Sequence, residues 1–227
     1  MTARGAARGT AAGALSLFLV LCYAVHTGRL VEVDLRARYW FLPPGRWGTP
    51  QRLEDVVVNL CQPTVTGIAL GLVAAISSLR RRSPWPLVAA LGLIALATSS
   101  VVVVKHTLAI PDIHGSTAHL GGSFPSGHMV GIVCFGGGIV LLRRRRLLGW
   151  LALAVLTTLV ASCLLLTAVH WVTDVAAGAL LGTALLALAA QLPLWRPAAG
   201  FSLRPASATR PPRVTRPPRV RTSPPPR

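Results

Sequence analysis

Acidic residues are scarce in this chain: its 227 residues include 6 aspartates and glutamates against 23 lysines and arginines. A basic excess of this size could indicate a nucleic-acid partner. The arginines, however, lie mainly between or after long apolar runs and do not gather on one compact module. A cytoplasmic membrane surface explains that pattern better, so no nucleic-acid partner is expected.

Cysteine is also rare, and the four cysteines have no spacing typical of a metal site. All of them fall within apolar stretches, as Cys22, Cys61, Cys134 and Cys163. We interpret them as small packing residues and not as a redox centre.

Charged residues make up 13% of the chain and hydrophobic residues 52%, which excludes an ordinary soluble domain of this size. Six apolar runs approach the length of about 20 residues that a helix needs to cross a bilayer. They lie near residues 11–27, 55–79, 85–104, 128–142, 147–169 and 171–192. The fourth run is short, and we expect its helix to extend into the flanks. The predicted fold is all-α: a polytopic membrane protein with a six-helix transmembrane bundle.

These runs divide the chain into four parts. Residues 1–27 are a first transmembrane span or signal anchor; a cleaved signal peptide is the alternative, but no small-x-small cleavage site follows. Residues 28–54 are an extracytoplasmic loop with an aromatic segment suited to the membrane interface. Residues 55–192 are the transmembrane core. Residues 193–227, rich in proline and arginine, predict a disordered tail that touches anionic lipid, with a partner-binding motif as the alternative.

Arginine clusters predict the orientation of the spans. They follow the second, fourth and sixth runs and also precede the first, so these ends belong in the cytoplasm. Both termini are then cytoplasmic, and the opposite ends of the spans meet at the extracytoplasmic face of the cell membrane.

Three polar segments fall at that outer face. Lys105 ends the third run, the stretch from Ser123 to His128 opens the fourth, and the stretch from His170 to Asp174 joins the last two. Ionisable residues at membrane level are rare and usually functional, so this convergence indicates a site.

His170 and Asp174 are four residues apart, so in a helical segment they would share one face and form a hydrogen bond through Nδ1–H. The imidazole Nε2 would then be free to act as a nucleophile. Ser126 and Gly127 could offer backbone N–H groups to phosphate, and His128 could give a proton to a leaving group. Lys105, the single lysine, could pair with a phosphate oxygen or simply reach the lipid headgroups. A helix cap and a polar contact are the ordinary alternatives for these residues.

Together the F-P-S-G-H and H-W-x-x-D-x-x-x-G stretches resemble the type-2 phosphatidic acid phosphatase superfamily over roughly residues 55–190. Its members include bacterial undecaprenyl-diphosphate and phosphatidylglycerol-phosphate phosphatases. The resemblance implies a catalytic set of His170 as nucleophile, Asp174 as its orienting partner and His128 as general acid. It also implies phosphate binding by Lys105, Ser126 and Gly127, with no metal or other cofactor.

Two arginines of the family pattern are missing. Ile110 stands where the first would follow the lysine, and Cys163-Leu164 replaces the Ser-Arg pair six residues before the histidine. Replacement cations could come from His106, His114 and His119, or from arginines of the first outer loop such as Arg36 and Arg38. Ordinary loop histidines are the alternative reading.

The leading hypothesis is a membrane-embedded lipid phosphatase or diphosphatase that hydrolyses a prenyl diphosphate or glycerolipid phosphate through a phosphohistidine. The alternative is a catalytically impaired member that binds lipid phosphate or acts as a scaffold. A transporter is less favoured, because no charged residue lies mid-span and no inverted repeat is evident. The expected partners are a lipid phosphate and the bilayer, and the sequence leaves open whether copies form a homo-oligomer.

Overall fold

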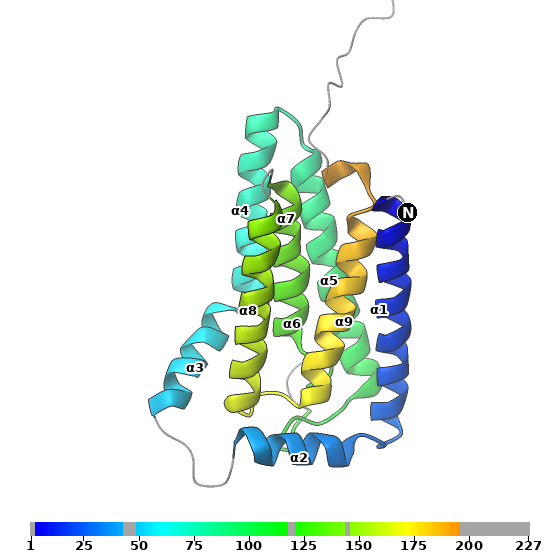
Figure 1. Ribbon diagram of the computed structural model, residues 1–227, viewed down its shortest axis with the longest axis vertical. Coiled ribbons are helices and arrows are strands. Elements are labelled where there is room, and N and C mark those ends of the chain that lie inside the picture. Colours follow the sequence, from blue (N-terminus) through cyan, green and yellow to red (C-terminus); the bar gives the residue numbers. More distant parts are fainter. Residues whose placement is uncertain (1–2, 43–48, 118–120, 144–145, 196–227) are drawn as a thin grey trace, which may run out of the picture. The chain divides into compact units, whose positions relative to one another are not determined.

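The computed structural model describes residues 3–42, 49–117, 121–143 and 146–195 (Figure 1). Within these ranges the chain is helical and contains no β-strand. The elements in chain order are α1 (Ala3–His26), α2 (Val31–Phe41), α3 (Thr49–Leu60), α4 (Pro63–Arg81), α5 (Trp85–Leu108), α6 (Gly127–Gly131), the π-helix η1 (Ile132–Gly136), α7 (Gly137–Leu142), α8 (Arg146–Leu166), α9 (Val172–Ala189) and the short 3-10 helix η2 (Pro193–Trp195). The predicted tail lies outside the described residues from position 196 onward.

The membrane-spanning helices agree with an all-α polytopic fold. Among the described residues, five helices are long and apolar enough to cross a bilayer, and the continuous helix Gly127–Leu142 is a shorter sixth. The five are Gly5–His26, Pro63–Arg81, Trp85–Leu108, Leu147–Leu166 and Val172–Ala189. The chain is therefore a multi-pass membrane protein, and its described residues hold five full-length candidate spans and one short one.

The predicted second span, near 55–79, corresponds to α4 but starts too early, because two helices occupy that stretch. Helix α3 ends at Leu60, Gln62 is extended, and α4 begins at Pro63. Proline suits the first turn of a helix and disfavours helical backbone in the residue before it, so the chain breaks here. The boundary placed at residue 55 falls inside α3.

The expected extension of the fourth span does not occur either. Its helix begins at Gly127 after an extended Ser126 and ends at Leu142 before an extended Arg143. Inside it, η1 widens one stretch to a π-helix, a deviation that is frequent near functional sites. The helix that carries His128 is therefore short, and its N-terminal end is held by a loop.

Helix α9 lies beside α1 (Figure 1) and makes a close approach to α6. A Cβ at Gly178 would lie 2.5 Å from the Ser126 carbonyl oxygen, so only glycine permits this spacing. From α1, Phe18 stacks on Phe124 with ring centroids 6.4 Å apart. The loop before α6 is thus packed between α1 and the first turns of α9.

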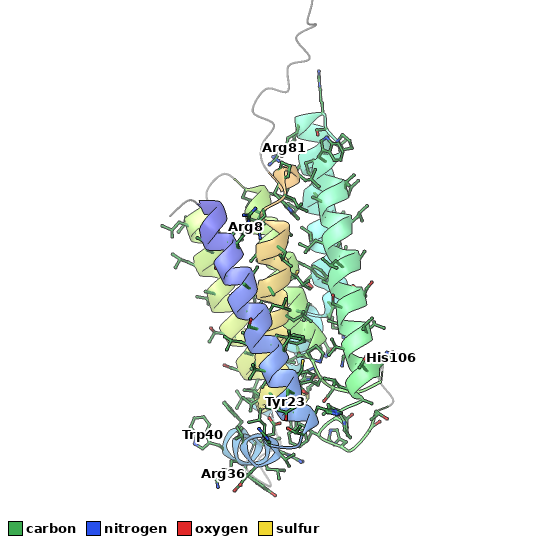
Figure 2. The ribbon with its side chains drawn as sticks, turned by 90° about the vertical axis from the view of Figure 1, so that its right-hand side faces the viewer. Arg8, Tyr23, Arg36, Trp40, Arg81 and His106 are labelled. Atoms are coloured by element: carbon green, nitrogen blue, oxygen red, sulfur yellow. The ribbon has the colours of Figure 1, made fainter. Side chains whose placement is uncertain are left out.

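The residues labelled in Figure 2 mark the two ends of the helices. Figure 2 shows Arg8 and Arg81 near one end, and Arg36, Trp40 and His106 near the other. Helix α2 runs across this second end (Figure 1), with the Trp40 side chain 79% exposed. An exposed aromatic helix across the span ends suits the interface between lipid and water.

Candidate active site

His170 and Asp174 form a buried hydrogen-bonded pair at the start of α9. The imidazole Nδ1 lies 3.2 Å from Asp174 Oδ2, and neither side chain is more than 9% exposed. Because a carboxylate accepts, Nδ1 carries the proton in this pairing. Nε2 then has no hydrogen-bond partner in the part of the chain that the structure describes.

The pair does not arise from two residues on one helix. His170 precedes α9, whereas Asp174 occupies the first turn of that helix and also accepts a hydrogen bond from the Trp171 backbone N–H at 3.1 Å. This contact is half of a capping box, and it turns the carboxylate back toward the residue before the helix. The same contact that starts the helix therefore orients the histidine.

His128 lies beside His170. The ring centroids are 5.9 Å apart and the rings meet edge to face, at 72°. His128 Nε2 is buried and has no hydrogen-bond partner among the described residues. A buried polar nitrogen without a partner is uncommon, so it is suited to meet a bound group.

Ser126 joins this pair through its backbone. Its N–H donates to the Asp174 carbonyl oxygen at 3.0 Å, while its hydroxyl oxygen is buried and unpartnered among the described residues. Gly127 follows at the helix start and lines a cavity that Lys105 also lines. The S-G-H stretch and the H-W-V-T-D stretch are thus held together by both backbone and side chains.

Lys105 is buried, and its ammonium holds the loop that leads to Ser126. Nζ donates to the Gly122 carbonyl oxygen and to the Ser123 carbonyl oxygen, the latter at 3.0 Å. Gly122 has φ +145°, and a Cβ there would lie 2.5 Å from the Ile110 carbonyl oxygen, so this turn requires glycine. Two of the three ammonium donors are therefore used within the protein.

Helix α2 contributes a contact that the sequence analysis did not foresee. Asp34 accepts hydrogen bonds from the backbone N–H and the hydroxyl of Thr173, at 3.0 and 2.7 Å. Burial raises the pKa of the Asp34 carboxyl, the bonds from Thr173 oppose that rise, and the charge of Asp174 adds to it. The one signal in the sequence is an acidic residue within the predicted outer loop 28–54.

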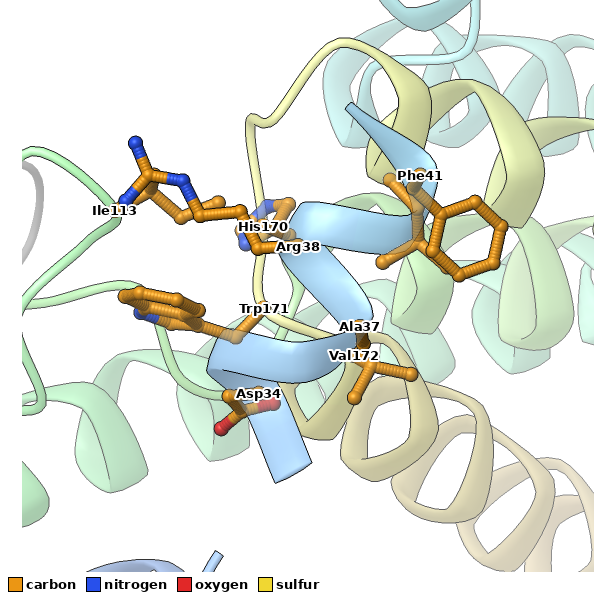
Figure 3. Close-up of a pocket in the computed structure, with 9 residues that line it drawn as sticks. Asp34, Ala37, Arg38, Phe41, Ile113, His170, Trp171 and Val172 are labelled. Atoms are coloured by element: carbon orange, nitrogen blue, oxygen red, sulfur yellow. The ribbon is translucent and has the colours of Figure 1, made fainter. Parts of the chain in front are cut away.

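Figure 3 shows a small cavity beside His170, between α2 and the start of α9. Asp34, Ala37, Arg38 and Phe41 line it from α2. The Arg38 guanidinium carbon lies 6.0 Å from the centre of the Trp171 ring, and the indole Nε1–H donates to the Pro111 carbonyl oxygen at 3.1 Å. The cavity beside His170 is therefore lined by a cation, Arg38.

The substitute cations named from the sequence fall in different places. His106 turns Nδ1 toward the Val102 carbonyl oxygen of its own helix, and Arg36 pairs with Glu32 at 2.5 Å. His114 lies in the loop after α5, and His119 lies outside the described residues. Of these side chains, Arg38 is the one that lines the cavity beside His170.

Neither position of the missing arginines carries another cation. Ile110 accepts a hydrogen bond from the Ser123 N–H through its backbone, and Leu164 is fully buried in an apolar cluster. Among the described residues, no group of three or more histidine, cysteine, aspartate or glutamate side chains is placed to hold a metal ion.

Two comparisons with known proteins found matches to this chain. Residues 106–198 match the family model described as the PAP2 superfamily. The fold resembles the crystal structure of a transmembrane PAP2-type phosphatidylglycerolphosphate phosphatase from Bacillus subtilis, with a TM-score of 0.68 and 21% sequence identity. That match covers 79% of this chain and 94% of the other. No curated protein matches the sequence significantly.

Proposed function

Because the chain belongs to the type-2 phosphatidic acid phosphatase superfamily, we propose that it hydrolyses a lipid-linked phosphate through a phosphohistidine on His170. The observation that carries this proposal is the hydrogen bond from His170 Nδ1 to the buried Asp174 carboxylate. It leaves the Nε2 lone pair of His170 without a partner among the described residues. His170 also lines a cavity, and the ring of His128, with its unpartnered Nε2, lies beside it.

In the first step, the His170 Nε2 lone pair attacks phosphorus, and the bond between phosphorus and the leaving oxygen breaks. Protonated His128 gives its proton to that oxygen, so the lipid alcohol or lipid monophosphate leaves with this oxygen protonated. Asp174 stabilises the positive charge that develops on the His170 ring.

In the second step, water attacks the phosphohistidine. His128, now neutral, takes a proton from the water. The water oxygen bonds to phosphorus, and the N–P bond breaks. Inorganic phosphate is released, and His170 returns to its starting form. Ser126, Gly127 and the remaining donor of Lys105 would bind the oxygens of the phosphoryl group in both steps.

The position of the site supports a lipid substrate. The histidine pair lies where α9 begins, next to α2, whose exposed aromatic residues suit the membrane interface. A prenyl or acyl chain can remain in the bilayer while the headgroup enters the site. From the arginines at the opposite end of the spans, we place the site at the extracytoplasmic face and the termini in the cytoplasm.

Phosphate release by the purified protein in mixed micelles tests the function. A panel of prenyl diphosphates and glycerolipid phosphates, assayed with EDTA present, should reveal turnover by the wild type. His170→Ala should abolish it, while Glu32→Gln, an exposed change on α2, should not. Full turnover by His170→Ala would refute the nucleophile. Lipid-phosphate binding without release by the wild type would favour the impaired, binding-only alternative.

A further inference from the structure

We propose that Arg38 of α2 is the guanidinium that binds the phosphate oxygens beside His170. This inference rests on the proposed function, because it assigns a ligand for the same phosphoryl group. A phosphate ester carries up to two negative charges, and strong binding at a shielded site needs charge-assisted donors. Lys105 supplies one cation, but two of its donors already bond to backbone carbonyls.

The location of Arg38 fits this role. It lines the cavity that His170 also lines, and its side chain passes over the Trp171 ring (Figure 3). The ring is itself held in place: the indole N–H donates to Pro111, and the Trp171 backbone N–H donates to Asp174. A guanidinium over an aromatic face keeps its in-plane N–H donors free for a planar pair of oxygens.

Helix α2 is positioned by a contact one turn before Arg38. Both oxygens of Asp34 accept hydrogen bonds from Thr173, which ties that face of α2 to the first turn of α9. Residues four apart share a helix face, so the same contact directs Arg38 toward the start of α9. The cation and the nucleophile are thus placed by one helix-to-helix junction.

The donors of Arg38 are not used elsewhere in the described part of the chain. Its guanidinium makes no hydrogen bond or ion pair there beyond the contact with the Trp171 ring. The nearest acid on its own helix face, Asp34, is occupied by Thr173. An arginine held beside a nucleophile with its donors open is suited to an anionic ligand.

Arg36 provides a matched comparison on the same helix. Its guanidinium bonds to Glu32 at 2.5 Å, both side chains are at least 75% exposed, and it does not line the cavity beside His170. A change at Arg36 removes the same charge from the same helix without touching the site. Any general effect of positive charge on micelle or membrane binding should therefore be shared by the two arginines.

Kinetics of Arg38→Ala, Arg38→Lys and Arg36→Ala test the assignment with the best lipid phosphate of the panel. Arg38→Ala should lower kcat/KM by roughly 10- to 100-fold, the effect of losing charge-assisted bonds to phosphate. Arg38→Lys should recover part of the loss, because it restores charge but not the paired donors. Arg36→Ala should stay within about twofold of the wild type, as expected for an exposed ion pair.

A binding measurement separates failure of this inference from failure of the function. Inorganic phosphate should raise the Tm of the wild type and of Arg36→Ala in detergent, and should raise that of Arg38→Ala much less. If the wild type releases no phosphate but this contrast holds, the anion site stands and hydrolysis does not. Equal kcat/KM or equal phosphate-induced Tm shifts in Arg38→Ala and wild type would overturn the inference, as would a wild type that binds no phosphate.

Discussion

The carboxylate of Asp34 bonds both the backbone N–H and the hydroxyl of Thr173, at 3.0 and 2.7 Å. Thr173 is in the first turn of α9, where backbone N–H groups lack partners within their own helix. A residue from α2 thus caps the helix that carries Asp174. The interfacial helix is in this way part of the site and not merely a cover for it.

Substitutions at Asp34 should show how much this cap contributes to the stability of the protein. Asp34→Ala should lower the stability of the detergent-solubilised protein by roughly 0.5–2 kcal/mol, as for other lost caps. Asp34→Asn keeps an acceptor oxygen and should lose less. Thermal unfolding followed by tryptophan fluorescence measures both. Equal Tm values for wild type and Asp34→Ala would show that the contact contributes nothing.

The raised pKa of Asp34 predicts a pH dependence for the same pair of proteins. Its folded pKa lies above the ordinary 3.8 because the carboxyl is desolvated, so the folded state binds the proton more tightly. This contribution to stability is therefore complete below 3.8 and is lost as pH rises through the folded pKa. The Tm of wild type relative to Asp34→Asn should increase on acidification from about pH 7 to 4. A Tm difference between the two proteins that does not change with pH would contradict a raised pKa of Asp34 in the folded state.

Asp174→Asn should impair catalysis while leaving the histidine in place. The amide no longer stabilises the imidazolium that forms during attack, and it can favour the wrong tautomer of His170. We expect a loss of roughly 100- to 10,000-fold in kcat, the range typical of acid–base partners. Phosphate release at saturating substrate measures it, and an unfolded variant is recognised by its lower Tm. A loss below tenfold in a folded variant would remove Asp174 from the mechanism.

His128 can be tested through the leaving group. If it protonates the departing oxygen, His128→Gln should greatly slow the cleavage of an alkyl phosphate and barely slow that of an aryl phosphate. The ratio of kcat/KM values measures this, because it reports only the steps up to departure of the leaving group. Equal losses for both substrates would assign His128 to binding instead.

Gly178→Ala should disturb both stability and activity from within the bundle. Its Cβ would lie 2.5 Å from the Ser126 carbonyl oxygen and 2.8 Å from Met129 Cβ, so α6 must move away from α9. Overpacking of this kind typically costs about 1–3 kcal/mol. Gly92→Ala is the control, because apart from its chain neighbours and its own helix backbone no atom lies within 4 Å of the added Cβ. Similar Tm values for the two variants would show that the helices separate without cost.

Apolar length alone predicted most of the bundle. The predicted spans near 85–104, 147–169 and 171–192 correspond to α5, α8 and α9, because a helix that crosses lipid must be long and uniformly apolar. Hydropathy placed the start of the second span too early, because Val56, Val57 and Val58 of α3 extend the apolar run ahead of Pro63. The sequence signal for the break between α3 and α4 is Pro63, because proline disfavours helical backbone in the residue before it.

Contacts between segments far apart in the sequence were harder to predict. The proximity of the two histidine motifs followed from topology, and the structure brings His128 and His170 together. The junction between Asp34 and Thr173 joins residues 139 positions apart and leaves no periodic trace in the sequence. Nor could sequence separate Arg36 from Arg38, because which of two neighbouring arginines faces inward depends on how α2 docks.

Helix α9 is by far the most sheltered of the five long apolar helices found in the described ranges: 67% of its most apolar window is buried, against 17–28% in the others. Acyl chains of the bilayer can therefore touch little of it. Differences in bilayer thickness or lipid composition would therefore act first on the outer helices. They would reach the Asp174 carboxylate only through those helices, so its surroundings should depend little on the lipid.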